Sequence, residues 1–421
     1  MFETLLQMPA PLLIGGALAL YMAWAIGAND VANAMGTSVG SGALGIRSAM
    51  LVAGVLEFGG AFLAGAHVTE TVRKGILDPE RFAESPELLV YGMLAALAAA
   101  ATWLLIASRR GWPVSTTHSI VGAIVGFGAV GVGADAVAWA KVGQIVVSWV
   151  TSPLLAGALA YFTFTMVRWT VLDQSDPIAA VRRVGPVFVF VVGFTLTLVT
   201  VFKGLKNLHL DLELDQALGV AAGIGALAAV AGRAVLMRVR IAESEDRDFH
   251  FRRVETLFAV LQVMTACAVA FAHGSNDVAN AIGPLASVFE GAAVGEVARQ
   301  AQIPTWMLAL GGLGIVVGLA TFGYRVMETV GRRITELTPS RGFSAELSAA
   351  LTIVIASRLG IPVSTTHTLV GAVLGVGLAR GIGALDLRVV GTIVVSWVVT
   401  LPAGAILAVF FFYFFKGLLG G

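Results

Sequence analysis

Two copies of one short motif place carboxylate and amide side chains inside apolar stretches of this sequence. The first copy reads Gly-Ala-Asn-Asp-Val-Ala-Asn-Ala at positions 27–34, and the second reads Gly-Ser-Asn-Asp-Val-Ala-Asn-Ala at positions 274–281. A charged side chain at the centre of a membrane helix costs about 2.5–3.5 kcal/mol on insertion scales. Two carboxylates at matched positions, Asp30 and Asp277, therefore indicate a functional site.

The spacing of the motif suits a cation site on one face of a helix. Asn29 and Asn33 are four residues apart with Asp30 between them, so all three side chains can point to one side of a bundle. Carboxylate and amide oxygens are ligands for small hard cations, and a monovalent ion can balance one aspartate. The predicted cation ligands are Asn29, Asp30, Asn33, Asn276, Asp277 and Asn280. The alternative is that the aspartates pair with an arginine or cap a broken helix.

A second duplicated motif, Pro-Val-Ser-Thr-Thr-His at 113–118 and 362–367, suits an anion. Proline is favoured at the first position of a helix, where the following backbone N–H groups have no partner in a preceding turn. Two such helix starts facing each other, with their hydroxyl groups, would form a cradle for an oxyanion. The predicted anion ligands are Ser115, Thr116, Thr117, Ser364, Thr365 and Thr366. Alternatively, these hydroxyl groups bond to carbonyl groups of the helices.

Further polar residues are duplicated beside these motifs. His118 and His367 follow the hydroxyl groups and could relay a proton or sense the protonation of the anion, and packing is the alternative role. Arg109 and Arg358 could reach an anion as charged donors, or could mark the aqueous end of a helix.

Two more matched pairs lie farther from the motifs. Gln144 and Thr392 occupy equivalent positions in the last helix of each half and could add a polar ligand near the centre. Glu70 and Glu328 stand close to arginines, where either a flanking ion pair or a cation site on the access path would account for them.

The composition is that of an integral membrane protein. The 421 residues are 57% hydrophobic and 13% charged, compared with about 25% charged residues in soluble proteins. Apolar runs of about twenty residues, rich in Ala, Leu, Gly and Val, predict spanning helices rather than the alternating strands of a barrel. We therefore predict an all-α polytopic membrane protein with about 10–12 membrane segments.

The sequence lacks the signatures of several other classes of protein. The single cysteine, Cys267, allows neither an internal disulfide nor a cysteine metal cluster, and its predicted role is packing. No basic run or RNA-binding signature indicates nucleic acid, and no Walker pattern indicates that ATP drives a process. Residues 1–10 contain no Lys or Arg, so we expect the first helix to be retained rather than cleaved as a signal peptide.

The chain divides into two related halves and a spacer. Besides the two motifs, Gly-Gln-Ile-Val-Val-Ser-Trp at 143–149 returns as Gly-Thr-Ile-Val-Val-Ser-Trp at 391–397, in the same order. The arginine-rich stretch 233–253 lies in the spacer, and the positive-inside tendency places it in the cytoplasm. The predicted units are a first transmembrane repeat at 1–167, a spacer with two membrane helices at 168–254, and a second transmembrane repeat at 255–421.

Counting the crossings predicts how the two repeats are oriented. Each repeat has an odd number of crossings and the spacer has two, so the second repeat should be inverted, with both termini outside. In secondary transporters with inverted repeats, the substrate binds near the midplane, where the copies meet. A parallel arrangement would require a miscounted crossing. The turn at 109–113 joins either two crossings or the two arms of a hairpin that dips into the membrane and returns.

The paired motifs at 27–34 and 274–281 resemble the signature of the inorganic phosphate transporter (PiT) family, and the resemblance covers nearly the whole chain. It implies two inverted-topology repeats with re-entrant helical hairpins. It also implies secondary transport of inorganic phosphate, coupled to sodium in many members and to protons in others, while some relatives are thought to move sulfate. The family's sodium-binding and phosphate-binding residues fall on the cation and anion ligands named above, and Ser275 in place of Ala28 leaves those ligands intact.

This resemblance completes the prediction from the sequence. The large central loop of eukaryotic members is missing, as in a prokaryotic protein, and relatives suggest a homodimer. We expect an importer of phosphate in the inner (plasma) membrane, not an enzyme, with Na⁺ at Asp30 and Asp277 as the coupling ion, no other cofactor, and alternating access. The alternatives are a proton-coupled phosphate or sulfate permease, a passive anion channel, and an intramembrane hydrolase with the two aspartates as its dyad.

Overall fold

Long apolar helices make up most of the structure, as the composition predicts. Nine helical segments among the described residues are long and apolar enough to cross a membrane, and two further apolar helices are shorter. This confirms the prediction of an all-α polytopic membrane protein. The computed structural model describes residues 9–74, 76–82, 85–203, 212–238, 247–293, 303–358 and 363–420.

The helices follow one another in the same order in the two halves of the chain. The first half contains α2 (Ala10–Gly40), α3 (Ile46–Lys74), η1 (Pro79–Phe82), α4 (Pro86–Arg110), α5 (Thr116–Gly131), η2 (Ala134–Ala136), α6 (Trp139–Val167) and the π turn η3 (Arg168–Leu172). The spacer contains α7 (Pro177–Lys203) and α8 (Leu214–Arg238). The second half contains α9 (Arg247–Asp277), α10 (Ala279–Ala293), α11 (Thr305–Glu328), the π turn η5 (Thr329–Arg333), α12 (Pro339–Arg358), α13 (Thr365–Ala379), η6 (Ile382–Ala384) and α14 (Leu387–Leu419).

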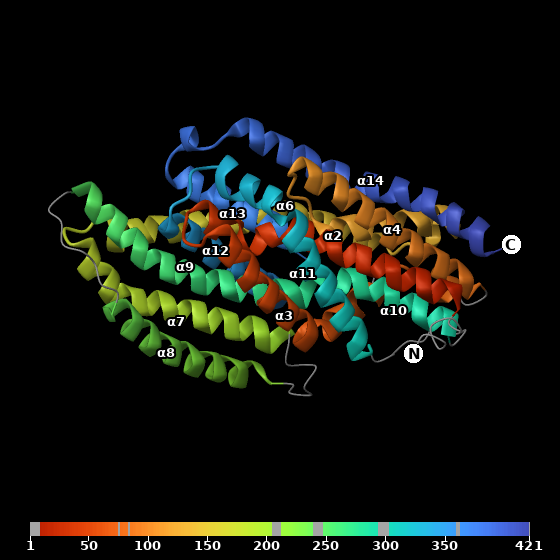
Figure 1. Cartoon of the computed structure of the whole chain (residues 1–421), viewed down its shortest axis with the longest axis horizontal. Helices are drawn as coiled ribbons and strands as arrows, with labels where there is room; N and C mark the ends of the chain where they lie inside the picture. Colours follow the sequence, from red (N-terminus) through yellow and green to blue (C-terminus); the bar gives the residue numbers. More distant parts are fainter. Residues whose placement is uncertain are drawn as a thin grey trace.

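The two halves pack on each other reciprocally. By sequence order, α2 corresponds to α9 with α10, α3 to α11, α4 and α5 to α12 and α13, and α6 to α14. Helix α2 packs against α11 while α9 packs against α3, and α5 packs against α14 while α13 packs against α6. In Figure 1, α2 begins at the right-hand end of the bundle and α9 begins at the left-hand end. The two motif-bearing helices therefore run in opposite directions, as expected for inverted repeats.

The first glycine of each Asn-Asp motif lies at a crossing that this packing creates. A Cβ atom on Gly27 would lie 1.9 Å from the carbonyl oxygen of Ile315 in α11, and one on Gly274 would lie 2.0 Å from that of Glu57 in α3. Glycine allows helix backbones to approach this closely. These glycines therefore set the close contact of α2 with α11 and of α9 with α3, beside the polar residues of each motif.

Two helical hairpins carry the hydroxyl motifs into the bundle. Helix α4 ends at Arg110, and Gly111, with a φ of 67°, caps it in the left-handed conformation before α5 begins at Thr116. Helix α5 has 16 residues and α13 has 15. At 1.5 Å per residue each is about 24 Å long or less, shorter than the ~30 Å hydrocarbon core of a bilayer. Helix α4, with 25 residues, is long enough to cross, so the re-entrant form of the hairpins stays a prediction.

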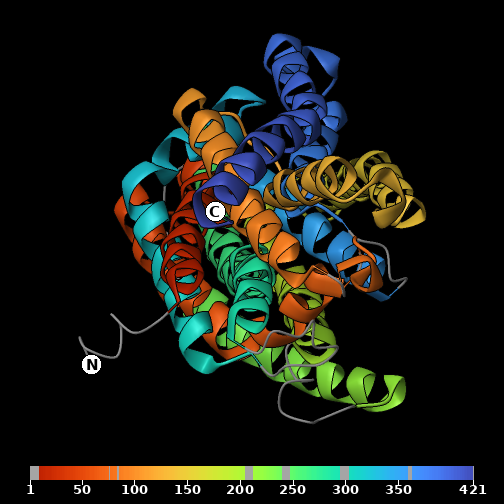
Figure 2. The ribbon, with the colours of Figure 1, turned by 90° about the vertical axis from the view of Figure 1, so that its right-hand side faces the viewer.

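The spacer forms the expected pair of helices, α7 and α8, at one edge of the bundle (Figures 1 and 2). Helix α8 packs on α7, with Gly225 against Phe190, while Leu227 is exposed. Exposed apolar side chains of this kind suit contact with lipid. The predicted boundary after residue 254 falls inside α9, which already begins at Arg247.

Candidate functional site

The first Asn-Asp motif lies in the middle of an unbroken helix, and the second lies at a helix break. Asn29, Asp30 and Asn33 are at most 2% exposed within α2. In the second copy, α9 ends at Asp277 and α10 begins at Ala279, so the helix is interrupted between them. The carboxylate of Asp30 therefore projects from the middle of a helix, and that of Asp277 from the last residue of one.

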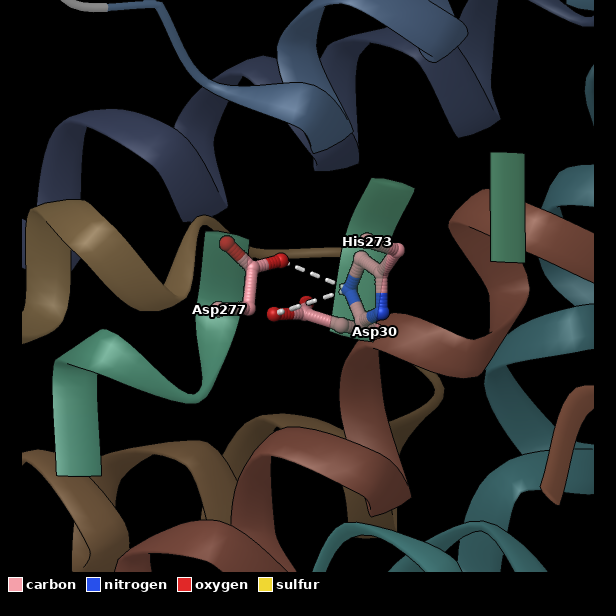
Figure 3. Close-up of side chains that lie close together, drawn as sticks. All are labelled: Asp30, His273 and Asp277. Atoms are coloured by element: carbon pink, nitrogen blue, oxygen red, sulfur yellow. Dashed lines mark ion pairs between the residues drawn. The ribbon is translucent and has the colours of Figure 1, made fainter. Parts of the chain in front are cut away.

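Two carboxylates and one imidazole share a small buried space at the centre of the bundle (Figure 3). The Nε2 atom of His273 lies 2.6 Å from Oδ2 of Asp277 and 3.9 Å from Oδ2 of Asp30. On the other side of the ring, Nδ1 of His273 lies 3.4 Å from Oε1 of Glu57, whose side chain is fully buried. Buried carboxylates in this number need positive charge nearby, so the cluster is suited to holding a cation.

Asn29 fixes the tip of the α4–α5 hairpin against α2. Its Nδ2 donates to the hydroxyl oxygen of Ser108 at 3.1 Å and to the carbonyl oxygen of Trp112 at 3.0 Å, and its Oδ1 accepts from the backbone N–H of Val114 at 3.2 Å. The Asn29 side chain therefore holds the turn that precedes the first hydroxyl motif against α2 by hydrogen bonds.

The residues predicted to bind a cation contact the residues predicted to bind an anion. The Thr116 hydroxyl donates to the carboxylate of Asp30. Asn33 donates through Nδ2 to the hydroxyl of Thr366 at 2.8 Å. At the equivalent positions of the other half, Asn280 donates to the hydroxyl of Thr117 at 3.4 Å. The two predicted sets of residues are thus in contact, and both repeats contribute to the contacts.

The two hydroxyl motifs begin their helices in the same way and lie side by side. Ser115 caps α5 by accepting from the N–H of His118 at 3.3 Å, and Ser364 caps α13 by accepting from the N–H of His367 at 3.2 Å. The Thr366 hydroxyl also donates to the carbonyl oxygen of Val114 at 3.3 Å, which joins the two helix starts. The expected pair of adjacent helix N-termini is therefore present.

The placement of proline at the first helical position was wrong for the first copy. Helix α5 begins at Thr116, and Pro113 lies two residues before its N-cap, because the serine side chain caps the helix and so sets its start. In the second copy, Pro362 lies outside the described residues.

Three other predicted contributors do not reach the site. Gln144 and Thr392 are exposed on α6 and α14, because the buried face of α6 is formed instead by residues such as Ile145 and Ser148. Arg109 is also exposed at the end of α4, where its carbonyl oxygen accepts a hydrogen bond from Arg325, so it marks a helix end rather than an anion site. The side chain of Arg358 lies outside the described residues.

Of the two flanking glutamates, Glu70 and Glu328, the structure describes the side chain of Glu328. Glu328 forms an exposed ion pair with Arg333 at 3.1 Å, which agrees with the flanking role rather than with a cation site. The side chain of Glu70 lies outside the described residues.

A further buried carboxylate, which the sequence did not single out, lies between α2, α9 and α12. Glu346 is fully buried and accepts hydrogen bonds from the hydroxyl groups of Thr37, Ser38 and Thr265 and from the amide of Gln262. The Ser38 bond measures 2.9 Å and the Gln262 bond 3.3 Å. This polar cluster stands one helical turn beyond Asn33 along α2.

Replacing Glu346 with Leu is expected to destabilise the protein strongly, because the buried donors of Thr37, Ser38 and Gln262 would lose their acceptor, whereas the Thr265 hydroxyl can still donate to the carbonyl oxygen of Gln262. Each unsatisfied buried donor costs about 1–3 kcal/mol. Thermal unfolding of the detergent-purified protein should show the loss, and the matched control is Glu336→Leu, since the Glu336 side chain is 82% exposed. Equal melting temperatures for the two variants would contradict this account of Glu346.

Two cavities border this network. A small one, of about 40 Å³, is lined by Asn33, His273, Asn276 and Thr365 and has room for a few water-sized particles or ions. A large one, of about 850 Å³, lies where α2 ends and α12 begins. Ser41 lines this large cavity, and its hydroxyl donates to Gln262 at 2.7 Å. Polar contacts therefore lead from the large cavity to the Glu346 cluster.

The part of the chain that matches a known protein family includes the residues of this site. The model of the phosphate transporter family matches residues 26–408, a span that includes both Asn-Asp motifs and both hydroxyl motifs. The chain belongs to the phosphate transporter family. Members of this family are membrane transporters, so this transporter is not an enzyme, and the hydrolase alternative is excluded.

Individual proteins are similar to this transporter over nearly its whole length. It is 46% identical to a Haemophilus influenzae protein named as a phosphate permease, over 95% of each chain. It is 44% identical to the chloroplastic inorganic phosphate transporter 2-1 of Arabidopsis thaliana, over 99% of this chain and 73% of that protein. A solved structure titled as the sodium-dependent phosphate transporter matches with a TM-score of 0.88 and 41% identity, over 98% of this chain and 100% of that one.

Proposed function

We propose that this transporter imports inorganic phosphate by symport with sodium. The observation that carries the proposal is the direct contact between the two predicted sets of residues, in which Asn33 bonds to Thr366 and Asn280 bonds to Thr117. A cation held by the Asn-Asp motifs would lie next to an anion held by the hydroxyl motifs. Each charge would then stabilise the other inside the membrane.

Sodium is proposed to bind at Asp30 and Asp277, and phosphate at the helix starts of α5 and α13. Carboxylate and amide oxygens suit a hard monovalent cation. The first backbone N–H groups of each helix and the neighbouring hydroxyl groups suit an oxyanion. Because the two carboxylates and a phosphate anion are costly to bury without cations, sodium bound at the aspartates would offset much of the negative charge of the loaded site.

Alternating access and orientation are part of the same proposal. The site is formed where the two oppositely directed repeats meet, which is the arrangement that rocking transporters use. Helix α2 begins and α14 ends at the same end of the bundle (Figure 1), which agrees with both termini outside. Arg168, Arg341 and Arg380 line the large cavity at the opposite end, which the positive-inside tendency assigns to the cytoplasm. We further propose that the protein is a homodimer in the inner (plasma) membrane.

Uptake of labelled phosphate into proteoliposomes tests this function. An inward sodium gradient should drive accumulation of phosphate above its external concentration, and dissipating that gradient should stop it. Phosphate uptake that is independent of sodium but is driven by an inward proton gradient would contradict sodium coupling. Flux without accumulation against a gradient would indicate a passive anion channel, and stronger uptake of sulfate would contradict the choice of substrate.

A further inference from the structure

Two histidines meet directly behind the helix starts that are proposed to hold phosphate. His118 and His367 are the residues that follow Thr117 and Thr366, and they are 2% and 1% exposed. Their ring centroids are 4.5 Å apart, with the rings perpendicular. Equivalent residues of the two repeats thus touch each other at the point where α5 and α13 begin.

Each histidine also packs on a tryptophan, so that four rings form a continuous row. His118 lies on Trp149 of α6, with ring centroids 4.0 Å apart, and His367 stacks on Trp397 of α14, with ring centroids 3.7 Å apart. The indole N–H of Trp397 donates to the carbonyl oxygen of Pro113 at 2.9 Å, just before α5. The row therefore connects α6, α5, α13 and α14 across the contact between the repeats.

The surroundings of this pair differ from those of the third buried histidine of the site. His273 faces the carboxylates of Asp30, Asp277 and Glu57. Among the described residues, the His118 ring packs on the aromatic rings of Trp149 and His367, and its Nδ1 atom has no hydrogen-bond partner. The geometry therefore gives the His118 ring a packing contact rather than a carboxylate with which to exchange a proton.

We infer that His118 and His367 are positioning residues that set the width of the phosphate site. The inference rests on the proposed function, in which the helix starts of α5 and α13 hold the anion. Because the two rings are in contact, their combined thickness fixes how closely Thr117 and Thr366 can approach each other. Flat rings in edge-to-face contact resist compression and are held by packing on both sides. The ring pair thereby makes the site discriminate between tetrahedral oxyanions of similar charge but different size.

The test compares His118→Leu, which removes the ring, with His118→Phe, which keeps a flat ring but cannot carry a proton. Both full-length variants are reconstituted in proteoliposomes and assayed for sodium-driven uptake of phosphate and of arsenate, whose bonds are longer. The Leu variant should raise the half-saturating phosphate concentration by about tenfold, the size expected for loss of one aromatic contact, and should shift preference toward arsenate. The Phe variant should restore both values to near those of the unmodified protein.

Sodium binding provides a readout that this positioning role should leave unchanged. Sodium added without phosphate should raise the melting temperature of the unmodified protein and of both variants equally. If His118→Leu does not assemble, Trp149→Leu with Trp149→Phe as its rescue tests the same row from its end, with the same expected results.

Several outcomes would overturn the inference. A Phe variant as impaired as the Leu variant would show that the ring nitrogens are needed. A Leu variant with reduced maximal rate but unchanged phosphate affinity and arsenate preference would show that the ring has a general structural role. Failure of the unmodified protein to concentrate phosphate would instead contradict the proposed function, which separates the two conclusions.

Discussion

Replacing both motif aspartates, Asp30→Asn together with Asp277→Asn, is expected to abolish sodium-driven phosphate uptake. The amide keeps the shape of the side chain, and its oxygen can still accept from the Thr116 hydroxyl, but the two negative charges that would hold sodium are lost. Interactions with a charged group contribute about 1.5–3 kcal/mol each, so removing two should lower uptake by roughly a hundredfold or more.

The measurement is initial uptake in proteoliposomes under an imposed sodium gradient, with the amount of reconstituted protein matched. The control is Asp135→Asn, because Asp135 forms an exposed ion pair with Arg81 and is 63% exposed. The control should transport at nearly the rate of the unmodified protein. Uptake that survives in the double variant would rule out the proposed cation site.

The single variants should differ in a way that the duplicated motifs alone do not predict. Asp277 lies 2.6 Å from Nε2 of His273, whereas Asp30 is 3.9 Å from that atom and accepts from Thr116. Asp277→Asn therefore removes the closest partner of His273, while Asp30→Asn leaves that pair intact. We expect the sodium-induced rise in melting temperature to be lost in both single variants. We expect the phosphate-induced rise to be reduced more in the Asp30 variant than in the Asp277 variant, because Asp30 adjoins the helix start of α5.

Duplication made the centre of the site predictable from the sequence. The six residues predicted to bind a cation and the six predicted to bind an anion were singled out because each motif occurs twice. In the structure, the contacts Asn33–Thr366 and Asn280–Thr117 join the two sets at equivalent positions. In the structure, α2 and α9, which carry the two copies of the Asn-Asp motif, pack against each other. The assignment of individual ions to these residues remains a prediction.

Single-copy residues could not be found by the same reasoning. His273 stands where the first half has Ile26, and Glu57 stands where the second half has Ile315. The search for matched polar pairs therefore passes over both, although His273 directly precedes the second motif. Glu346 was missed for the same reason, since its surroundings become polar only when α2, α9 and α12 are packed together.

Duplication also misled the prediction where the phase of the helix was ignored. Gln144 and Thr392 are matched, but both face outward. In a helix, the buried stripe recurs every three or four residues, and in α6 it runs through Ile145, Ser148 and Ser152. The neighbouring Gln144 is about 100° away from Ile145 around the helix axis, so its side chain faces away from the centre of the bundle.

Replacing Gly27 with Ala is expected to disrupt the crossing of α2 and α11, although it adds a single methyl group. The new Cβ would lie 1.9 Å from the carbonyl oxygen of Ile315, and a backbone oxygen cannot move aside as the end of a flexible side chain can. Overpacking of this kind costs about 1–3 kcal/mol or more. Because Asp30 lies one turn away, displacement of α2 should also impair the site.

Gly16→Ala in the same helix is the matched control for this prediction. Nothing lies within 4 Å of a Cβ at Gly16, and alanine favours the helical backbone over glycine by about 0.5–1 kcal/mol, so this variant should melt at the same or a higher temperature. Thermal unfolding of both detergent-purified variants, followed by sodium-driven uptake, separates packing from binding. If Gly27→Ala melts like Gly16→Ala but no longer transports, the first glycine of the motif serves the ion site rather than the helix crossing.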